Sequence, residues 1–578
     1  MAGPTAPKDP EKARPFFYIL KDKDIFGERQ KDGTGIQFIY ESDGRLINSA
    51  QITGNVTDKE ELRLLETVEG FGRLVHSIGV SVETDRPEET AEFVFQMYGK
   101  KDLYGGGTNL TTSLKCDGME HRIYLSDYRW TEDDHVPGQI KILFASPERM
   151  GKVSVRLFLN DGYEAPPEEE DLVIDMHSEE YCGMISRSLL QLGNPYRIRK
   201  AIEKSKAGKE VTLAYIGGSI TQGAGAIPIH TECYAYKSFQ LFQNRFSTQN
   251  NVRFIKAGVG GTPSELGMIR FDRDVLREGE RPDIVVIEFA VNDEGDETKG
   301  VCYESLVRKV LKLPWKPAVV LLFSVFANDW NLQERLRPVG DLYDLPMVSI
   351  RDAVTPQFSL KCGEGRILSK NQFFYDIFHP NNTGHTIMAD CLQYLFERCD
   401  AAEPARVGTF VEGMTEEQIL SEKLSGPAVI GADFERIFLL DKKNRYVGAK
   451  IRAGSFTSTD MELQSVEMDG NLIQTPEFPY NWMYDGSRPQ MAGFEMEIIC
   501  KSLFLIFKDS GETDVGKANV FVNDVYCMTA DPHKNNWLHC NAVLLFWETE
   551  SRSHKVRIAV TEEDRNKKFT ILGFGYTI

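Results

Sequence analysis

The chain has 578 residues, of which 41% are hydrophobic and 26% charged, a balance typical of soluble globular proteins. This length predicts roughly two to four domains, each large enough to bury a core. The 67 basic and 86 acidic residues give a net charge of −19. An acidic surface repels nucleic acids and anionic lipids, so we expect neither as a partner. No apolar run is long enough to predict a membrane span.

The first residues are polar and proline-rich, without the apolar stretch of a secretory signal. The ten cysteines include no Cys-x-x-Cys pair, a pattern that indicates reduced thiols rather than a disulfide framework. Cys540, His539 and His533 are too few to predict a four-ligand zinc site, so we expect no metal. Together these features predict a cytoplasmic location.

Short alternating β-type segments fill residues 15–160, separated by Gly, Asp, Asn and Pro clusters. This spacing predicts an N-terminal β-sandwich of jelly-roll type, a module that often binds carbohydrate. Residues 161–180 contain nine acidic residues and no Lys or Arg. We interpret them as a solvated linker, and we place the end of the first domain at residue 190.

The next region, residues 191–405, alternates strand-like and helix-like segments, which predicts an α/β domain with a doubly wound, flavodoxin-like parallel sheet. Wholly apolar runs predict buried parallel strands at 211–216, 252–255, 284–291 and 318–324. Helices are predicted at 195–208, 234–246, 264–278, 303–312 and 386–398.

Residues 406–578 are again β-rich and predict a second β-sandwich, similar to carbohydrate-binding modules. Its loops carry the aromatic residues Tyr480, Trp482, Tyr484 and Trp537. Such rings stack on sugars or cap a hydrophobic core, and the sequence leaves both roles open.

Ser219 follows the first apolar run of the central domain, after Gly217 and Gly218. Two glycines let the backbone turn sharply, which places Ser219 at the carboxyl end of a strand, where open α/β sheets bind their ligands. A serine in this position is a candidate nucleophile, although it is also an ordinary turn residue.

Asn292 and Asp293 follow the run 284–291. An asparagine amide at a strand end can donate to the oxyanion of a tetrahedral intermediate. Asn-Asp is equally ordinary turn chemistry.

Asp376 precedes His379 by three residues, and Pro380 follows. A carboxylate at this spacing can reach the imidazole Nδ1 and leave Nε2 free to take a proton from a serine. A salt-bridged surface histidine has the same spacing, so the order of all the segments is what favours an acid–base pair.

A glycine-rich segment, 257–263, follows the strand predicted at 252–255. A glycine there can turn its N–H towards a ligand. Trp330 follows the fourth predicted strand and should lie at the same sheet edge as Ser219. It either lines the substrate site or is a partly buried tryptophan.

These segments resemble the Ser, Gly, Asn and His blocks of the SGNH (GDSL-type) hydrolase family over roughly residues 195–400. The segment 217–221 has Gly218 where the family usually has Asp, and 290–293 has Ala290 for Gly, whereas 376–380 is intact. The Gly-Gly-Ser-Ile-Thr form is similar to that of carbohydrate O-acetylesterases.

The resemblance implies that Ser219 is the nucleophile, His379 the base and Asp376 its orienting acid. It also implies an oxyanion hole formed by the Ser219 N–H, Asn292 and one glycine N–H. Alignment of the second block favours Gly261, with Gly258 and Gly260 as alternatives. No cofactor is expected.

We therefore expect a serine esterase that removes O-acetyl groups from oligosaccharides through an acyl-serine intermediate. The β-rich flanks are expected to shape substrate choice rather than chemistry. Two alternatives remain, a lipase or thioesterase acting on longer acyl chains and a non-catalytic glycan-binding protein. A homo-oligomer is compatible with the sequence.

Overall fold

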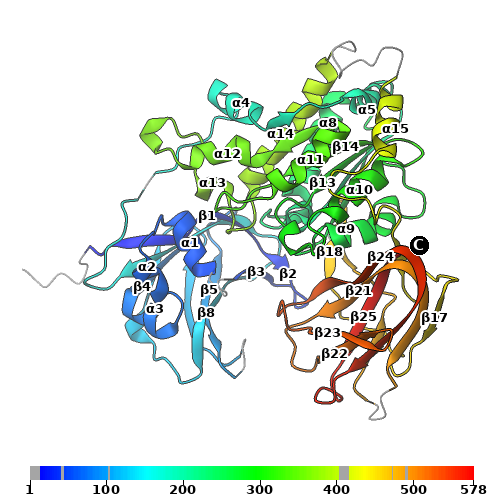
Figure 1. Cartoon of the computed structure of the whole chain (residues 1–578). Helices are drawn as coiled ribbons and strands as arrows, with labels where there is room; N and C mark the ends of the chain where they lie inside the picture. Colours follow the sequence, from blue (N-terminus) through cyan, green and yellow to red (C-terminus); the bar gives the residue numbers. More distant parts are fainter. Residues whose placement is uncertain are drawn as a thin grey trace, which may run out of the picture.

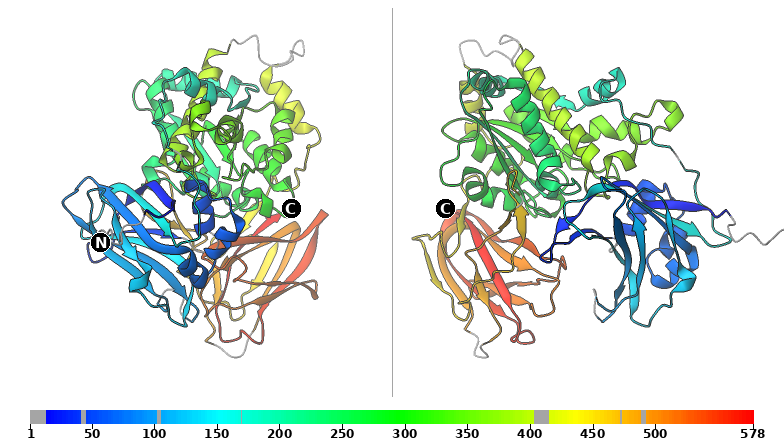
Figure 2. Two further views of the ribbon diagram at one scale, coloured as in Figure 1. Left: turned by 90° about the vertical axis from the view of Figure 1, so that its left-hand side faces the viewer. Right: turned by 180° about the vertical axis from the view of Figure 1, so that it is seen from behind.

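The computed structural model describes residues 13–40, 45–101, 105–168, 170–402, 415–471, 473–487 and 492–578. A central α/β region carries two β-rich regions on the same side, one formed by the N-terminal and one by the C-terminal part of the chain (Figures 1 and 2). The expected domain boundary at 405/406 lies outside the described residues.

The central sheet has the strand order β10-β15-β14-β13-β11-β12. All neighbouring pairs are parallel except β10, which runs antiparallel to β15. The strands are β10 (Leu189–Gln191), β11 (Val211–Gly217), β12 (Val252–Gly258), β13 (Ile284–Glu288), β14 (Ala318–Phe323) and β15 (Met347–Ser349). Every residue of β11, β13 and β14 is buried, as expected for strands covered on both faces. The four strands predicted from apolar runs are thus confirmed.

Helices cover both faces of this sheet (Figure 1). One core is shared with α4 (Glu179–Ser186), α5 (Tyr196–Lys206), α8 (Tyr234–Phe246), α12 (Ile350–Phe358) and α14 (Asn382–Ala401). The core on the other face is shared with α9 (Ser264–Phe271), α10 (Val301–Leu311) and α11 (Gln333–Tyr343). The helix predicted at 234–246 is confirmed with its bounds, and the others differ by a few residues at their ends.

The N-terminal region contains two antiparallel sheets, β1-β9-β4-β7 and β2-β3-β8-β5-β6, whose buried residues form one hydrophobic core. The strands are β1 (Phe16–Phe26), β2 (Glu28–Arg29), β3 (Gly35–Tyr40), β4 (Val75–Thr84), β5 (Thr90–Gly99), β6 (Asn109–Lys115), β7 (His121–Tyr124), β8 (Asp134–Phe144) and β9 (Met150–Leu159). The β-rich character is confirmed, while the jelly-roll connectivity stays a prediction.

Three short helices in this region were not expected: α1 (Arg45–Thr53), α2 (Lys59–Leu64) and α3 (Val68–Leu74). The side chains of Asp58 and Thr67 cap α2 and α3 by accepting backbone N–H bonds of the first turn. Segments of six to nine residues are too short to show a clear helical period.

The C-terminal region forms a connected antiparallel sheet along the path β16-β25-β21-β24-β22-β23, with β17 and β20 as further partners of β21 and β25. Its long strands are β21 (Phe494–Asp509), β24 (His539–Val560) and β25 (Phe569–Thr577). The shorter ones are β16 (Phe438–Leu440), β17 (Ala449–Arg452), β20 (Trp482–Tyr484), β22 (Ala518–Val522) and β23 (Val525–Ala530). A separate pair, β18 (Ser465–Glu467) and β19 (Gln474–Pro476), lies beside the central region.

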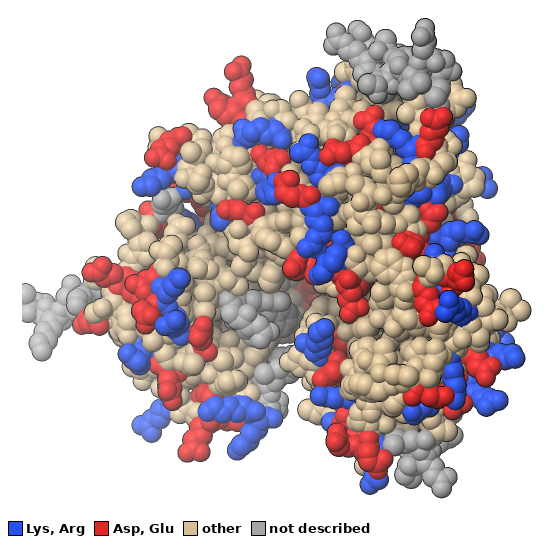
Figure 3. Space-filling view, in the orientation of Figure 1, with Lys and Arg blue, Asp and Glu red and all other residues tan. Residues whose placement is uncertain are grey.

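Shorter helical segments complete the described chain: α6 (Ser219–Gln222), α7 (Ile229–Glu232), α13 (Lys370–Phe373) and α15 (Glu416–Ser425). A π-helix over Asp272–Leu276 continues α9, and single 3₁₀ turns lie at Leu125–Asp127, Asp293–Gly295 and Cys362–Glu364. No helix in the described ranges combines the length and apolar character of a membrane span. Acidic and basic side chains are interspersed over the face shown in Figure 3.

Candidate active site

The strand order of the central sheet defines where a ligand can bind. The five parallel strands lie side by side as β12-β11-β13-β14-β15. Numbered along the chain from β11, this is the flavodoxin-like order 2-1-3-4-5, whose topological switch point lies between the first and third strands. Ser219 follows β11 and Asn292 follows β13. The fold therefore brings both predicted residues to the crevice that doubly wound sheets use for ligands.

Ser219, His379 and Asp376 form one hydrogen-bonded array. The His379 Nε2 lies 2.9 Å from the Ser219 Oγ, and the His379 Nδ1 lies 2.9 Å from Oδ2 and 3.0 Å from Oδ1 of Asp376. The Asp376 Oδ1 also accepts the backbone N–H groups of Phe378 and His379. These bonds fix the short turn that presents the imidazole to the serine. The geometry is that of a nucleophile activated by an oriented base.

Three N–H donors near Ser219 are unpaired within the described part of the chain. They are the Ser219 N–H at the start of α6, the Gly261 N–H and the Asn292 Nδ2, none of which has an acceptor there. The buried Oδ1 of Asn292 has no partner there either. Asn292 lies against Gly218, the neighbour of the serine. Ser219 and Asn292 are half-buried, whereas Gly261 is exposed. Three donors without an acceptor beside a nucleophile suit a negatively charged oxygen.

The structure distinguishes the three candidate glycines of the second block. Gly258 ends β12 and is paired with Gly217. The Gly260 N–H donates to the Gln222 Oε1 at 2.9 Å. Gly261 is exposed, its N–H has no acceptor among the described residues, and its φ of +72° is a left-handed conformation that favours glycine. These observations favour Gly261, the residue that the sequence alignment preferred.

Gly218 stands where the resembled family usually has aspartate. A Cβ atom built on Gly218 would lie 2.1 Å from the Oδ1 and 2.8 Å from the Nδ2 of Asn292. Any side chain at this position would displace the Asn292 amide. The glycine that replaces the family's usual aspartate therefore stands in close contact with Asn292.

Asp293, beside Asn292, has a structural task. Its Oδ1 accepts the Ser264 N–H at 2.8 Å, at the first turn of α9, which follows the Gly261 segment. Burial and the nearby Asp296 carboxylate raise the pKa of Asp293 well above its usual range. Asn292 therefore lies near Ser219, whereas Asp293 links the 290–293 segment to the start of α9, which follows the glycine segment.

Beneath the array lies Glu288, the last residue of β13, which sequence reasoning did not single out. It is fully buried, and its Oε2 accepts the Thr221 hydroxyl at 3.1 Å. The Thr221 Oγ1 also lies 2.8 Å from the Tyr234 hydroxyl. Burial raises the pKa of Glu288 to about 7. A carboxyl residue inside an apolar strand was the available signal in the sequence.

Arg270 of α9 is a second residue that the sequence did not reveal. Its guanidinium is fully buried and donates to the carbonyl oxygens of Gly217 at 2.8 Å and Ala257 at 2.7 Å. It also pairs with Asp274 at 3.0 Å. Arg270 therefore holds the carboxyl ends of β11 and β12 together, directly before the Ser219 turn and the glycine segment.

Aromatic rings extend outward from His379. Phe378 is 39% exposed and packs edge-on against Phe326, which is stacked on Trp330 with ring centroids 5.8 Å apart. Trp330 is half-buried, and its role in lining the substrate site stays a prediction. The loop aromatics of the C-terminal region divide between core and surface: Trp482 and Tyr484 are buried, whereas Tyr480 and Trp537 are 44% exposed.

Within the described ranges, side chains that can ligate a metal gather away from the Ser219 array. One group, Glu265, Asp296 and Cys302, brings its ligand atoms within 4.8 Å of one another. The Asp296 oxygens accept N–H and hydroxyl groups of the following turn, and burial raises the pKa of Glu265 well above its usual range. Because these oxygens already serve the turn and burial disfavours the charged carboxylate of Glu265, we interpret the group as a structural cluster. His533 and His539, weighed above for zinc, contact backbone carbonyl groups instead.

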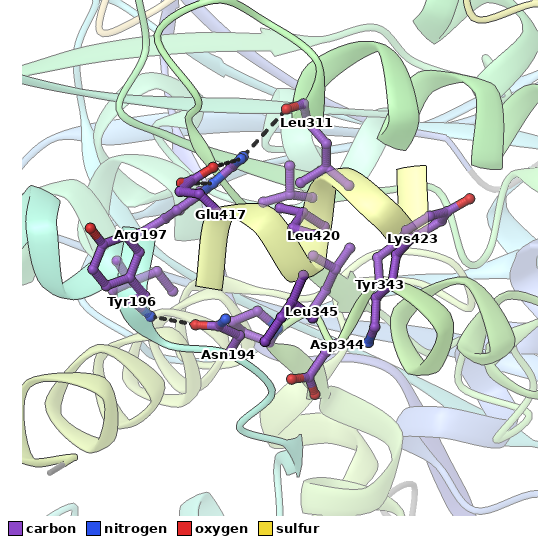
Figure 4. Close-up of a pocket in the computed structure, with 15 residues that line it drawn as sticks. Asn194, Tyr196, Arg197, Leu311, Tyr343, Asp344, Leu345, Glu417, Leu420 and Lys423 are labelled. Carbon is purple, nitrogen blue, oxygen red and sulfur yellow. Dashed lines mark hydrogen bonds and ion pairs between the residues drawn. The ribbon is translucent and has the colours of Figure 1, made fainter. Parts of the chain in front are cut away.

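A pocket elsewhere in the central region contains none of the predicted site residues (Figure 4). It lies between the starts of α5 and α15 and the ends of α10 and α11. Arg197 pairs with both carboxylate oxygens of Glu417 at 3.1 and 3.0 Å and donates to the Leu311 and Pro317 carbonyls. The polar groups at this pocket are thus used to attach α15 to the central region.

Comparisons with known proteins agree with this architecture. Residues 215–387 match the model of the GDSL-like lipase/acylhydrolase family. A crystal structure of a two-domain esterase (CEX) active on acetylated mannans is similar, with 23% identity, a TM-score of 0.54, and coverage of 68% of this chain and 98% of that one. The structure of such an esterase co-crystallized with mannopentaose gives 23% identity, a TM-score of 0.53 and the same coverage. No curated protein matches the sequence.

At this identity the structural likeness shows a shared fold, namely the SGNH hydrolase fold with a mixed, mainly parallel sheet and flanking β-rich regions. The family match spans the segments that contain Ser219, Gly261, Asn292, Asp376 and His379. The central part of this chain, residues 215–387, is therefore similar in sequence to the GDSL-like lipase/acylhydrolase family.

Proposed function

We propose that this protein is a serine esterase that removes O-acetyl groups from oligosaccharides. The observation that carries the proposal is the Ser219–His379–Asp376 array beside three N–H donors that have no acceptor in the described part of the chain. An acyl-transfer site needs this combination of a nucleophile, an oriented base and preorganised donors. A glycan-binding protein without catalytic activity has no use for it.

In the proposed reaction, the Ser219 Oγ attacks the ester carbonyl carbon while the His379 Nε2 takes its proton. The oxyanion of the tetrahedral intermediate accepts hydrogen bonds from the Ser219 N–H, the Gly261 N–H and the Asn292 amide. When the intermediate collapses, the sugar hydroxyl leaves with the proton from His379. Water then attacks the acetyl-serine with the same proton relay, which releases acetate and restores the serine.

The substrate class rests on indirect support. Both similar structures are of a two-domain esterase (CEX) active on acetylated mannans, and one of them was co-crystallized with mannopentaose. Exposed rings of Trp537 and Phe378 lie close to Gly261 and His379 respectively, and sugar rings stack well on aromatic side chains. The cysteine pattern supports a cytoplasmic location as part of the same proposal.

The test of this proposal is the loss of esterase activity in Ser219→Ala. We expect activity to fall to background, because the substitution removes the nucleophile, and we expect the fold to be kept, because only one hydroxyl is lost. The assays are turnover of an aryl acetate and release of acetate from acetylated oligosaccharides, followed by mass spectrometry. Ser359→Ala, at the exposed end of α12, is the matched control and should keep full activity. Wild-type turnover in Ser219→Ala would refute the assignment of the site.

A lipase or thioesterase is the alternative, and acyl-chain length separates it from an acetylesterase. Each methylene that enters an apolar pocket contributes about 0.8 kcal/mol, so a lipase should improve from acetate to octanoate. An acetylesterase should lose activity steeply beyond two or three carbons, roughly where the chain exceeds a small acyl pocket. We expect kcat/KM to fall along the series acetate, butyrate, octanoate and palmitate; a rise towards octanoate would favour the lipase.

A further inference from the structure

The Gly260 C=O and the Gly261 N–H belong to one peptide unit. Because a trans peptide is planar, these two groups point in opposite directions, and the orientation of one fixes the other. The Gly260 oxygen accepts a hydrogen bond from the Gln464 Nε2 at 2.8 Å, while the Gly261 N–H has no acceptor among the described residues. The side chain that holds this peptide therefore comes from the C-terminal region, about 200 residues further along the chain.

Gln464 is itself held in place. It is buried, directly before β18, and its Oε1 accepts the Cys540 N–H at 2.9 Å. The acceptor for Cys540 and the donor to Gly260 are thus opposite ends of one amide, which assigns its oxygen and nitrogen without ambiguity. A side chain fixed at both ends loses little further entropy when it orients the peptide.

The neighbouring polar groups of the glycine segment are also occupied. The Gly260 N–H donates to the Gln222 Oε1, and the Gln222 Nε2 donates to Glu467 of β18 at 3.1 Å. On the other side, the His539 Nε2 lies 3.1 Å from the Gly261 oxygen. Of the four backbone N–H and C=O groups of the two glycines, the Gly261 N–H alone has no partner in the described chain.

We propose that Gln464 is a positioning residue for the oxyanion hole and that the C-terminal region thereby takes part in the chemical step. Its amide fixes the peptide plane of the Gly261 N–H. A hydrogen bond to the carbonyl oxygen also polarises the peptide and makes the N–H at its other end a stronger donor. This inference rests on the proposed esterase function, and it assigns the C-terminal region a role beyond substrate choice.

The proposal predicts an effect on the transition state. The Gly261 N–H is still present in Gln464 variants, but its peptide is less polarised and its orientation is less restricted. Losing one net hydrogen bond of ordinary strength corresponds to about a tenfold fall in kcat. The KM for a small aryl acetate should change little, because the ground-state ester does not need the oriented donor.

The experiment uses the full chain with the variants Gln464→Glu and Gln464→Met. Ionised glutamate keeps the acceptor for Cys540 but has no donor for Gly260, whereas methionine has similar length and neither polar group, so it removes the donor whatever the protonation state. Asn519→Asp is the matched amide-to-acid control on β22, where the Asn519 Oδ1 accepts the Thr529 hydroxyl, a bond that aspartate retains. The assay measures kcat and KM on aryl acetate, inhibition by methylboronic acid, which forms a tetrahedral adduct with the serine, and the melting temperature.

We expect both Gln464 variants to lose about tenfold in kcat and to bind the boronic acid more weakly by a similar factor, with KM unchanged and the control like wild type. Unchanged kcat and boronate affinity in a folded variant would overturn the proposal. A rise in KM alone would also overturn it, because Gln464 would then act in substrate binding. Should one variant fail to fold, the other decides.

The two proposals fail in different ways. If Ser219→Ala keeps activity, the esterase assignment itself is wrong. If activity depends on Ser219 but is indifferent to Gln464, the esterase assignment stands and the role of the C-terminal region in the chemical step is refuted.

Discussion

Gly218 and Asn292 touch so closely that a single methyl group between them is excluded: a Cβ atom on Gly218 would lie 2.1 Å from the Asn292 Oδ1. Gly218 directly follows β11, and Asn292 lies four residues past the end of the neighbouring strand β13. The position of the Asn292 amide therefore depends on the absence of a side chain beside the nucleophile.

Gly218→Ala should accordingly impair catalysis by displacing Asn292. We expect a loss of about 10²–10³ in kcat, comparable to the removal of an oxyanion donor, and Gly218→Asp should lose at least as much. Steady-state kinetics on aryl acetate would measure this. Gly295→Ala is the control, since a Cβ there meets nothing within 4 Å, and it should retain activity. A fully active Gly218→Ala variant would show that Asn292 is not needed where it lies.

Trp330→Ala should separate large substrates from small ones. The Trp330 ring supports Phe326, which in turn packs against Phe378 beside His379. Aromatic contacts contribute roughly 0.5–1.5 kcal/mol, so we expect KM for an acetylated oligosaccharide to rise about three- to tenfold, while aryl acetate kinetics stay near wild type.

Trp315→Ala serves as the matched control for this substitution. Trp315 is also half-buried but precedes β14, at the opposite end of the sheet, where its indole N–H donates to the Pro282 carbonyl. An equal rise of KM in both variants would contradict a local role of Trp330.

Glu288 should make stability depend on pH in a particular direction. Its pKa is raised by burial from 4.5 to about 7, so folding favours the protonated form. The stability it contributes is fully present below about pH 4.5 and is lost as the pH rises through about 7, with an upper limit of roughly 3 kcal/mol.

Glutamine at position 288 is neutral at every pH. Between about pH 5 and pH 8, where Glu288 ionises, Glu288→Gln should therefore lose less stability than wild type. Urea unfolding at both pH values would measure the difference. Glu278→Gln, whose side chain is 93% exposed, should behave as wild type. Identical pH dependence in Glu288→Gln and wild type would mean that Glu288 does not titrate in this range.

Arg270→Ala should be strongly destabilising. It would remove the guanidinium donor from the carbonyl groups of Gly217 and Ala257 and would remove a buried partner of Asp274. Breaking such a buried pair costs about 3–5 kcal/mol. Arg245→Ala breaks an exposed pair with Glu397 and should cost at most about 1 kcal/mol. Comparable melting temperatures for the two variants would contradict the role given to Arg270.

The sequence alone determined the central strands and the chemistry at their ends. Apolar runs such as 211–216 and 284–291 have a local cause, burial on both faces of a sheet, and they are readable without any tertiary contact. Because parallel strands place their carboxyl ends at one edge, the positions of Ser219 and Asn292 after two apolar runs already predicted that they would meet. His379 was assigned from its spacing to Asp376 and from the order of the segments.

The tertiary structure decided what depends on contacts between distant segments. Gln464 reaches Gly260 across 204 positions of the chain, and Arg270 reaches Gly217 across 53. A lone glutamine before a short strand and an arginine inside a helix have no local pattern that reveals a partner. Such residues act through hydrogen bonds whose partners are fixed only when separate regions pack together. The roles of Gln464 and Arg270 beside the site could therefore be recognised only in the folded chain.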